Sequence, residues 1–323
     1  MRTLRLTLPL VALAAALWPA AAFAHGAEKA KPDALTLLTG WEFDPLFIAA
    51  GAVASWLYIA GVRRVNHRHP ASPFPRRRVV FFFLGMGVLV LALISPFAAY
   101  DTSLFTVHMA QHLLLTLVAA PLLLLGTPVT LALRAASPSL RRDWLLPVLH
   151  SRVMKVLTFP VVAWLLFTAA MWGSHFSPLY NAALEHEWLH RLEHLWYLSA
   201  ALFLWWQVIG LDPTPWRMGY PIRLLYLFLQ MPQNSFLSIA ILNSETVIYD
   251  HYASISRSWG PSALSDQEYA GITMWILGDL LFITAMGFVA YAWMQHEERV
   301  PRREDRARAL ARQRAAAAGP PPA

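Results

Sequence analysis

The chain has no cysteine among its 323 residues, and charged residues make up only 14% of it. Without cysteine there are no disulfides, no Cys-x-x-Cys redox motifs and no thiolate ligands. Any metal ion must therefore be bound by histidine, methionine or carboxylate side chains. So little charge, beside 57% hydrophobic residues, excludes an ordinary soluble domain. The composition instead indicates a polytopic protein of the lipid bilayer.

Apolar segments recur along the chain between residues 45 and 295, each near the ~20 residues that a helix needs to cross a bilayer. We therefore expect an all-α bundle of seven transmembrane helices. Residues 25–44 would precede the bundle on the outer side. Residues 296–323 form a basic, low-complexity tail that we expect to be disordered. The seven spans are predicted at 45–62, 79–99, 105–133, 153–172, 188–209, 223–243 and 271–294.

Residues 1–24 have the features of a secretory signal peptide. Arg2 and Arg5 precede the apolar run from Leu8 to Trp18, and Ala22-Phe23-Ala24 fits a small-x-small cleavage site. Because the apolar run is short, we expect cleavage. The alternative is an uncleaved first helix, and the topology of the rest of the chain is the same in both cases.

Basic residues are distributed unevenly among the segments that join the predicted helices. Of the 26 Lys and Arg residues, 20 fall in four such segments, and only 3 fall in segments on the opposite side. Because basic loops remain in the cytoplasm, this asymmetry predicts an outer N-terminus and an inner C-terminus. The net charge of +7 therefore reflects topology and does not indicate nucleic-acid binding. The four basic segments are 61–78, 134–155, 210–223 and 295–323.

Histidines gather at the outer ends of two predicted spans. His108 and His112 lie four residues apart on the third span, so both imidazoles share one helix face. His186, His190 and His194 repeat the same spacing into the fifth span. Ionisable side chains within membrane spans are costly and usually face the protein interior or an aqueous cavity. We expect the two sets of imidazoles to face each other at similar depth.

Such histidines form a predicted metal site. Two imidazoles at i and i+4 can chelate one ion, and several imidazoles suit copper, zinc or iron. Met109 lies between His108 and His112, and a thioether favours Cu(I) over zinc. The alternative is that these side chains make only interhelical hydrogen bonds and packing contacts.

Three further polar side chains lie within the predicted spans. Arg191 and Glu193 are on the fifth span, and Asp279 is on the seventh. Arg191 would pair with one of these two carboxylates as a structural contact. Alternatively, a carboxylate would orient a ligand histidine through its second ring nitrogen.

The segment His186-Glu187-Trp188-Leu189-His190 matches H-E-x-x-H, the pattern of zinc proteases. In those enzymes the two histidines bind zinc and the glutamate activates water. The pattern is short, this region is rich in His and Glu, and no third ligand motif is evident. We therefore treat an intramembrane protease as a minor alternative.

Four stretches carry a family resemblance: HMAQHLLLTLVAAPLLLLGTP at 108–128, LYNAALEHEWLHRLEHLWYLSAALFLWWQVIG at 179–210, DPTPWRMGYPIRLLYLF at 212–228 and LSDQEYAGITMWILGD at 264–279. In this order they resemble the seven-span CtaG-type cytochrome c oxidase assembly factors of bacteria. The resemblance covers about residues 45–295. It implies a multi-pass protein of the bacterial plasma membrane that is needed to mature haem–copper oxidases, plausibly in copper supply.

Together these observations favour a non-catalytic assembly factor over an enzyme. It would bind Cu(I) at the outer face and pass it to cytochrome c oxidase subunits, with other copper chaperones as further expected partners. A haem-binding protein, either a b-type cytochrome or a haem-modifying enzyme, is the main alternative, because facing histidines can ligate haem iron. A purely scaffolding role is another. The predicted copper ligands are His108, His112, His190 and His194, with His186 or Met109 assisting.

Overall fold

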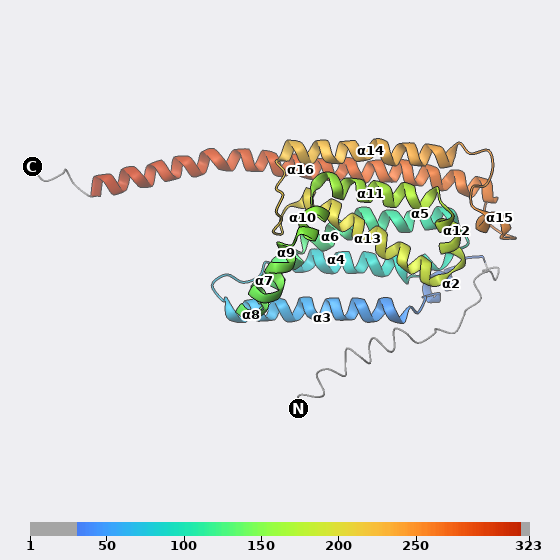
Figure 1. Ribbon diagram of the computed structural model, residues 1–323, viewed down its shortest axis with the longest axis horizontal. Helices are drawn as coiled ribbons and strands as arrows, with labels where there is room; N and C mark the ends of the chain where they lie inside the picture. The colour runs from blue at the N-terminus through green and yellow to red at the C-terminus, as the bar shows by residue number, and fades with distance from the viewer. Residues whose placement is uncertain (1–30, 318–323) are drawn as a thin grey trace, which may run out of the picture.

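The computed structural model describes residues 31–317, and that part of the chain folds into helices and connecting loops, without a strand (Figure 1). The predicted signal peptide, residues 1–24, lies outside the described residues. The all-α prediction is confirmed for the part that is described. The longest helices are α3 (Pro45–Arg68), α4 (Arg76–Leu93), α13 (Glu187–Ile209), α14 (Tyr220–Leu242) and α16 (Ala263–Ala317).

Five segments of the described chain are long and apolar enough to cross a membrane. They match five of the seven predicted spans. The other two predicted spans correspond to α11 (Pro160–His175) and α13. The first has only 16 residues, because Pro160 starts a new helix, and the second carries Glu187, Arg191 and Glu193 in its first two turns. The five segments are Pro45–Arg68, Arg76–Tyr100, Phe105–Ala135, Tyr220–Leu242 and Ala263–Arg299.

The long helices run side by side, and the short elements lie at the two ends of the bundle (Figure 1). One end carries α2 (Ala34–Thr39), η1 (Ala98–Tyr100), α12 (Pro178–Glu185) and α15 (Asp250–Ser254). The basic segments 61–78 and 134–155 lie at the opposite end, as the predicted orientation requires. The short elements of that end are α7 (Pro128–Ala135), α8 (Pro138–Leu140), η3 (Arg141–Leu145), α9 (Leu146–Leu149) and α10 (Arg152–Leu157).

The third span is assembled from several helical pieces in the middle of the bundle. α5 (Phe105–Leu113) passes into the π-helix η2 (Leu114–Ala119) and then into α6 (Ala120–Leu125). Proline explains the change of register. Pro121 has no N–H, so in the π register the carbonyl of Thr116 loses its donor, and the indole of Trp205 donates to that carbonyl at 2.8 Å instead.

Two buried aspartates from distant segments cap the two ends of this third span. Asp266 accepts hydrogen bonds from the backbone N–H of Phe105 at 2.7 Å and from the hydroxyl of Thr106 at 2.7 Å. Asp212 accepts from the N–H and the hydroxyl of Thr130, at 2.7 and 2.6 Å, where α7 begins. Each carboxylate thus satisfies the otherwise unpaired donors of a helix N-terminus.

The tail differs from its prediction. Helix α16 continues beyond the bundle to Ala317, so residues 296–317 are helical rather than disordered (Figure 1). This segment is rich in Ala, Arg and Glu, all of which have high helix propensity. Its low hydrophobicity indicated that it would not pack in a core, but that property does not prevent a helix from extending.

Candidate metal centre

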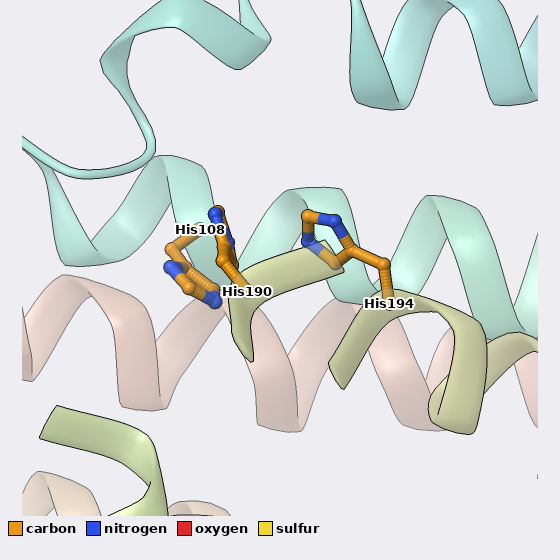
Figure 2. Close-up of side chains that lie close together, drawn as sticks. All are labelled: His108, His190 and His194. Atoms are coloured by element: carbon orange, nitrogen blue, oxygen red, sulfur yellow. The ribbon is translucent and has the colours of Figure 1, made fainter. Parts of the chain in front are cut away.

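Four histidines from α5 and α13 converge near the end of the bundle that carries α12 and α15. The ring centres of His108 and His190 are 5.1 Å apart, and those of His112 and His194 are 5.7 Å apart. Along each helix the i, i+4 rings are 4.3 Å apart. Figure 2 shows His108 of α5 beside His190 and His194 of α13. The predicted facing of the two histidine sets is therefore present in the fold.

The two imidazoles of α5 are arranged as a chelating pair. Their Nε2 atoms lie 2.9 Å apart, and neither side chain is more than 2% exposed. Two nitrogens bound at ~2.0–2.1 Å to one ion, at a right angle, would be separated by about 2.9 Å. The i, i+4 spacing thus produces the donor separation that a single metal ion requires.

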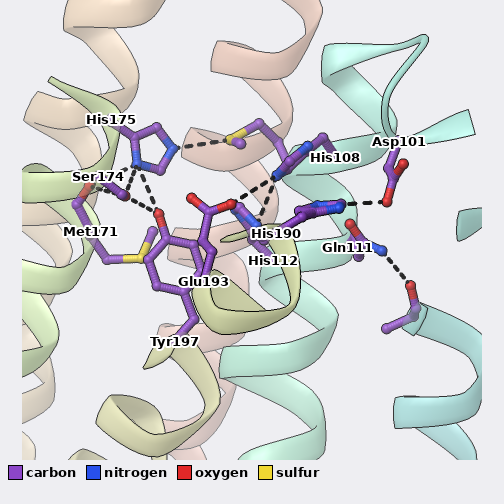
Figure 3. A network of polar contacts seen from close by, with 12 residues as sticks. Asp101, His108, Gln111, His112, Met171, Ser174, His175, His190, Glu193 and Tyr197 are labelled. Atoms are coloured by element: carbon purple, nitrogen blue, oxygen red, sulfur yellow. Dashed lines mark hydrogen bonds and ion pairs between the residues drawn. The ribbon is translucent and has the colours of Figure 1, made fainter. Parts of the chain in front are cut away.

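Two sets of three donors meet the geometric requirement for a metal ion, with all ligand atoms of each set within 4.8 Å of one another. One set is His108, His190 and His194, and the other is His108, His112 and Glu193. His108 belongs to both, and a carboxylate oxygen of Glu193 lies 4.0 Å from its Nε2 (Figure 3). Glu193 is thus positioned as a ligand as much as an orienting group.

Burial differs across the cluster. His108 and His112 are buried, whereas His190 and His194 are partly exposed. His190 also faces the carboxylate of Asp101, with Nε2 3.8 Å from Oδ2 (Figure 3). A metal ion would therefore first meet the imidazoles of α13 and then the interior pair on α5.

Several polar atoms at the centre have no hydrogen-bond partner among the described residues. They include Nδ1 of His112, Nε2 of His194 and both carboxylate oxygens of Glu193. Buried polar atoms are normally paired, so such a concentration requires an explanation. An ion bound between these donors would supply the missing interactions.

Tyr252 of α15 determines which nitrogen of His108 is free. Its hydroxyl donates to the carbonyl of Asp101 at 2.7 Å and lies 3.1 Å from Nδ1 of His108. Burial, reinforced by the Asp101 carboxylate, raises the pKa of Tyr252 well above its ordinary value, so the phenol keeps its proton. Because that proton goes to the carbonyl, the hydroxyl accepts from His108 Nδ1–H, which leaves Nε2 with a free lone pair.

The other predicted residues lie away from this centre. Arg191 pairs with Glu187 and, at 3.0 Å, with Asp44, so its partners are neither Glu193 nor Asp279. Asp279 accepts hydrogen bonds from Ser235 at 2.8 Å and from Asn234 at 3.2 Å in the α14–α16 contact. Both residues have structural contacts at these positions.

His186 is an exposed residue at the N-cap of α13 and belongs to neither set of metal-binding donors. Glu187 is held by Arg191 instead of facing His190 across a zinc site. The H-E-x-x-H segment of the described chain therefore does not assemble as it would in a metalloprotease.

Met109 does not point at the other histidines of α5. Its sulfur lies 3.5 Å from Nε2 of His175, the last residue of α11 (Figure 3). His175 is 1% exposed and was not predicted to take part in the site. Tyr252 and Asp101 were missed as well, because each belongs to an outer loop that carries no periodic pattern.

A family model described as the cytochrome c oxidase caa3 assembly factor, Caa3_CtaG, matches residues 56–296. The chain belongs to this family. The match spans every helix that contributes to the histidine cluster and confirms the resemblance recognised in the sequence. This family member is thus a membrane protein of the oxidase assembly factor class.

Similar proteins occur in mycobacteria. Uncharacterised proteins of Mycobacterium bovis and Mycobacterium tuberculosis are each 36% identical over 282 residues, and one of Mycobacterium leprae is 33% identical. The alignments cover 85% of this chain and 42% of each relative. The chain therefore spans less than half the length of these relatives. No solved structure matches it.

Proposed function

We propose that this assembly factor delivers Cu(I) to a subunit of a haem–copper oxidase in the bacterial plasma membrane and is not itself an enzyme. Copper is the cargo. It would be held by His108, His112, His190 and His194, with Glu193 as an additional donor. The observation that carries the proposal is the convergence of these imidazoles from two helices, with unpaired donor atoms, in a chain of the oxidase assembly family.

The arrangement of donors suits transfer more than storage. A closed site with four fixed ligands would hold the ion tightly, whereas overlapping three-donor sets allow one ligand to be exchanged at a time. His108 is common to both sets, so an ion could move from the partly exposed imidazoles of α13 to the buried pair without losing all its ligands. The reverse movement would release it to a client.

The proposed topology has seven spans, with α11 and α13 as the fourth and fifth crossings. In a bundle the polar first turns of α13 can be tolerated, because they face the histidine cluster and not lipid. An outer N-terminus and an inner C-terminus would place the cluster near the outer face. Copper carried by other chaperones would reach it there, and an oxidase subunit in the same membrane would receive it.

The rival functions fit this geometry less well. Imidazoles that ligate haem iron lie on opposite sides of a macrocycle, whereas here the rings of His108 and His112 contact each other directly. A zinc protease requires both histidines of the H-E-x-x-H segment, and His186 is exposed outside the cluster.

Oxidase maturation in cells tests the proposal. Replacing His108 and His112 with alanine should abolish oxidase activity while the protein remains inserted at normal abundance. The matched control is His67→Ala/His69→Ala, an exposed pair at the opposite end of the bundle, which should leave maturation unchanged. Normal oxidase activity in the His108/His112 variant would contradict the copper-delivery function.

A further inference from the structure

The contact between Met109 and His175 lies deeper in the bundle than the partly exposed imidazoles of α13. The thioether sulfur and Nε2 are 3.5 Å apart, and each side chain is 1% exposed. Neither residue belongs to the donor sets described above. The pair joins α5 to α11, so it uses a different helix from the cluster formed with α13 (Figure 3).

Hydrogen bonding at the other ring nitrogen determines the tautomer of His175. Its Nδ1 lies 2.7 Å from the carbonyl oxygen of Met171, which can only accept. The hydroxyls of Ser174 and Tyr197 lie near the same nitrogen, at 3.2 and 3.3 Å. The proton of a neutral His175 therefore resides on Nδ1, and Nε2 presents a lone pair.

That lone pair faces another one. A thioether sulfur has no hydrogen to donate, so the contact between Nε2 and Sδ places two electron donors against each other in a buried site. A packing contact alone would not favour this orientation, because the same ring nitrogen could pair with a donor. A cation between the two atoms turns the contact into an attractive one.

The spacing and the chemistry of the two donors specify the kind of cation. With metal–nitrogen and metal–sulfur lengths of ~2.0 and ~2.3 Å, a tetrahedral angle separates the two donor atoms by about 3.5 Å. Thioether and neutral imidazole together select a soft monovalent ion, and a site without a carboxylate does not compensate the charge of a divalent one. Cu(I) satisfies both conditions.

We propose that Met109 and His175 form a second, internal Cu(I) site that receives the ion from the histidine cluster. The transfer route has a plausible intermediate, since the ring of His112 lies 6.3 Å from that of His175 and its Nδ1 has no hydrogen-bond partner. The role in transfer rests on the proposed copper-delivery function. Binding of Cu(I) at the pair does not, and it can be measured separately.

The test uses the full-length protein purified in detergent, titrated with Cu(I) under reducing conditions and examined by copper X-ray absorption. Wild-type protein should show a sulfur scatterer at about 2.3 Å. Met109→Leu should lose that signal and bind about one copper fewer per chain. Met274→Leu is the matched control, because Met274 is equally buried in α16, and it should retain both the signal and the stoichiometry.

A second variant separates loss of the ligand from loss of the fold. In His175→Asn the amide N–H can still donate to the Met171 carbonyl, but nothing replaces Nε2. This variant should also bind one copper fewer. The site is overturned if sulfur scattering and stoichiometry are the same in wild type, Met109→Leu and His175→Asn.

The cluster variant His190→Ala/His194→Ala distinguishes the two proposals. It should lose nitrogen-ligated copper but keep the sulfur signal. If it supports normal oxidase maturation and keeps that signal, the delivery function fails while the internal site stands. If it blocks maturation but no sulfur signal exists in any variant, the delivery function stands and the internal site fails.

Discussion

Two kinds of buried polar group lie along the third span, and their hydrogen bonding differs. At the ends of the span, the carboxylates of Asp266 and Asp212 accept hydrogen bonds from backbone N–H groups and threonine hydroxyls. Within the histidine cluster, Nδ1 of His112, Nε2 of His194 and the oxygens of Glu193 have no such partners. Both regions are equally buried, so burial alone does not explain the contrast.

The difference separates structural from functional polarity. A buried group that serves the fold has its donors and acceptors satisfied, because an unsatisfied one costs about 1–3 kcal/mol. The cluster retains several unsatisfied atoms at one place, and that cost is sustained only if a ligand is bound there for part of the time. Substitutions at the caps should therefore affect stability, whereas substitutions in the cluster should affect copper.

The largest effect on the fold is expected at the outer cap. Asp266→Ala removes the acceptor for Phe105 and Thr106 and leaves the buried guanidinium of Arg257 without its carboxylate at 3.7 Å. Breaking such a buried pair should lower the free energy of unfolding by about 3 kcal/mol, measured by denaturant unfolding in detergent. Asp250→Ala, at an exposed carboxylate, is the control. Unchanged stability in Asp266→Ala would remove one side of the comparison.

The largest effect on copper is expected in the cluster. His190→Ala/His194→Ala removes two of the three donors of one set and should lower Cu(I) affinity about 100-fold or more, as determined by competition with a chelator. Stability should change by less than about 1 kcal/mol, because no hydrogen bond of the fold is lost at Nε2 of His194. A large loss of stability with intact copper binding would assign these histidines to the fold.

A smaller effect is expected from Tyr252→Phe. The variant keeps the ring but loses the hydroxyl that accepts from His108 Nδ1. Copper affinity should fall about 10-fold, because the tautomer with free Nε2 is no longer enforced. Tyr269→Phe, at an exposed tyrosine of α16, provides the control. Identical affinities in the two variants would show that His108 needs no orienting hydroxyl.

The smallest effect is expected at the start of α13. His186→Ala and Glu187→Gln alter exposed residues that belong to neither donor set. Copper content and oxidase maturation should remain within error of wild type, and the surface ion pair with Arg191 contributes at most about 0.5 kcal/mol. Loss of function in Glu187→Gln would revive the metalloprotease alternative.

The sequence was sufficient to predict the helical bundle and the meeting of His108, His112, His190 and His194. Those inferences depend on apolar length and on i, i+4 spacing, which are local properties of a helix. The partners across the bundle were not predictable in this way. Tyr252 is 144 residues from His108 along the chain, and His175 was assigned to a loop, so neither contact follows from any periodic pattern.

The same reasoning explains the remaining differences. The fourth span is shorter in the fold because Pro160 begins α11 after a separate short helix, and hydropathy does not detect such a break. Met109 was grouped with His108 and His112 because it lies between them in the sequence. On a helix an intervening residue points away from that face, and Met109 contacts His175 on α11.

The most direct test of a copper site at the α5–α13 cluster is metal analysis, with an absorption spectrum, of detergent-purified wild type and His108→Ala/His112→Ala. We predict that wild-type protein retains copper after dialysis, shows no Soret band, and that the double variant has lost the copper of the cluster. Equal copper in the two proteins, or a wild type that binds no copper even when supplied with Cu(I), would contradict the account.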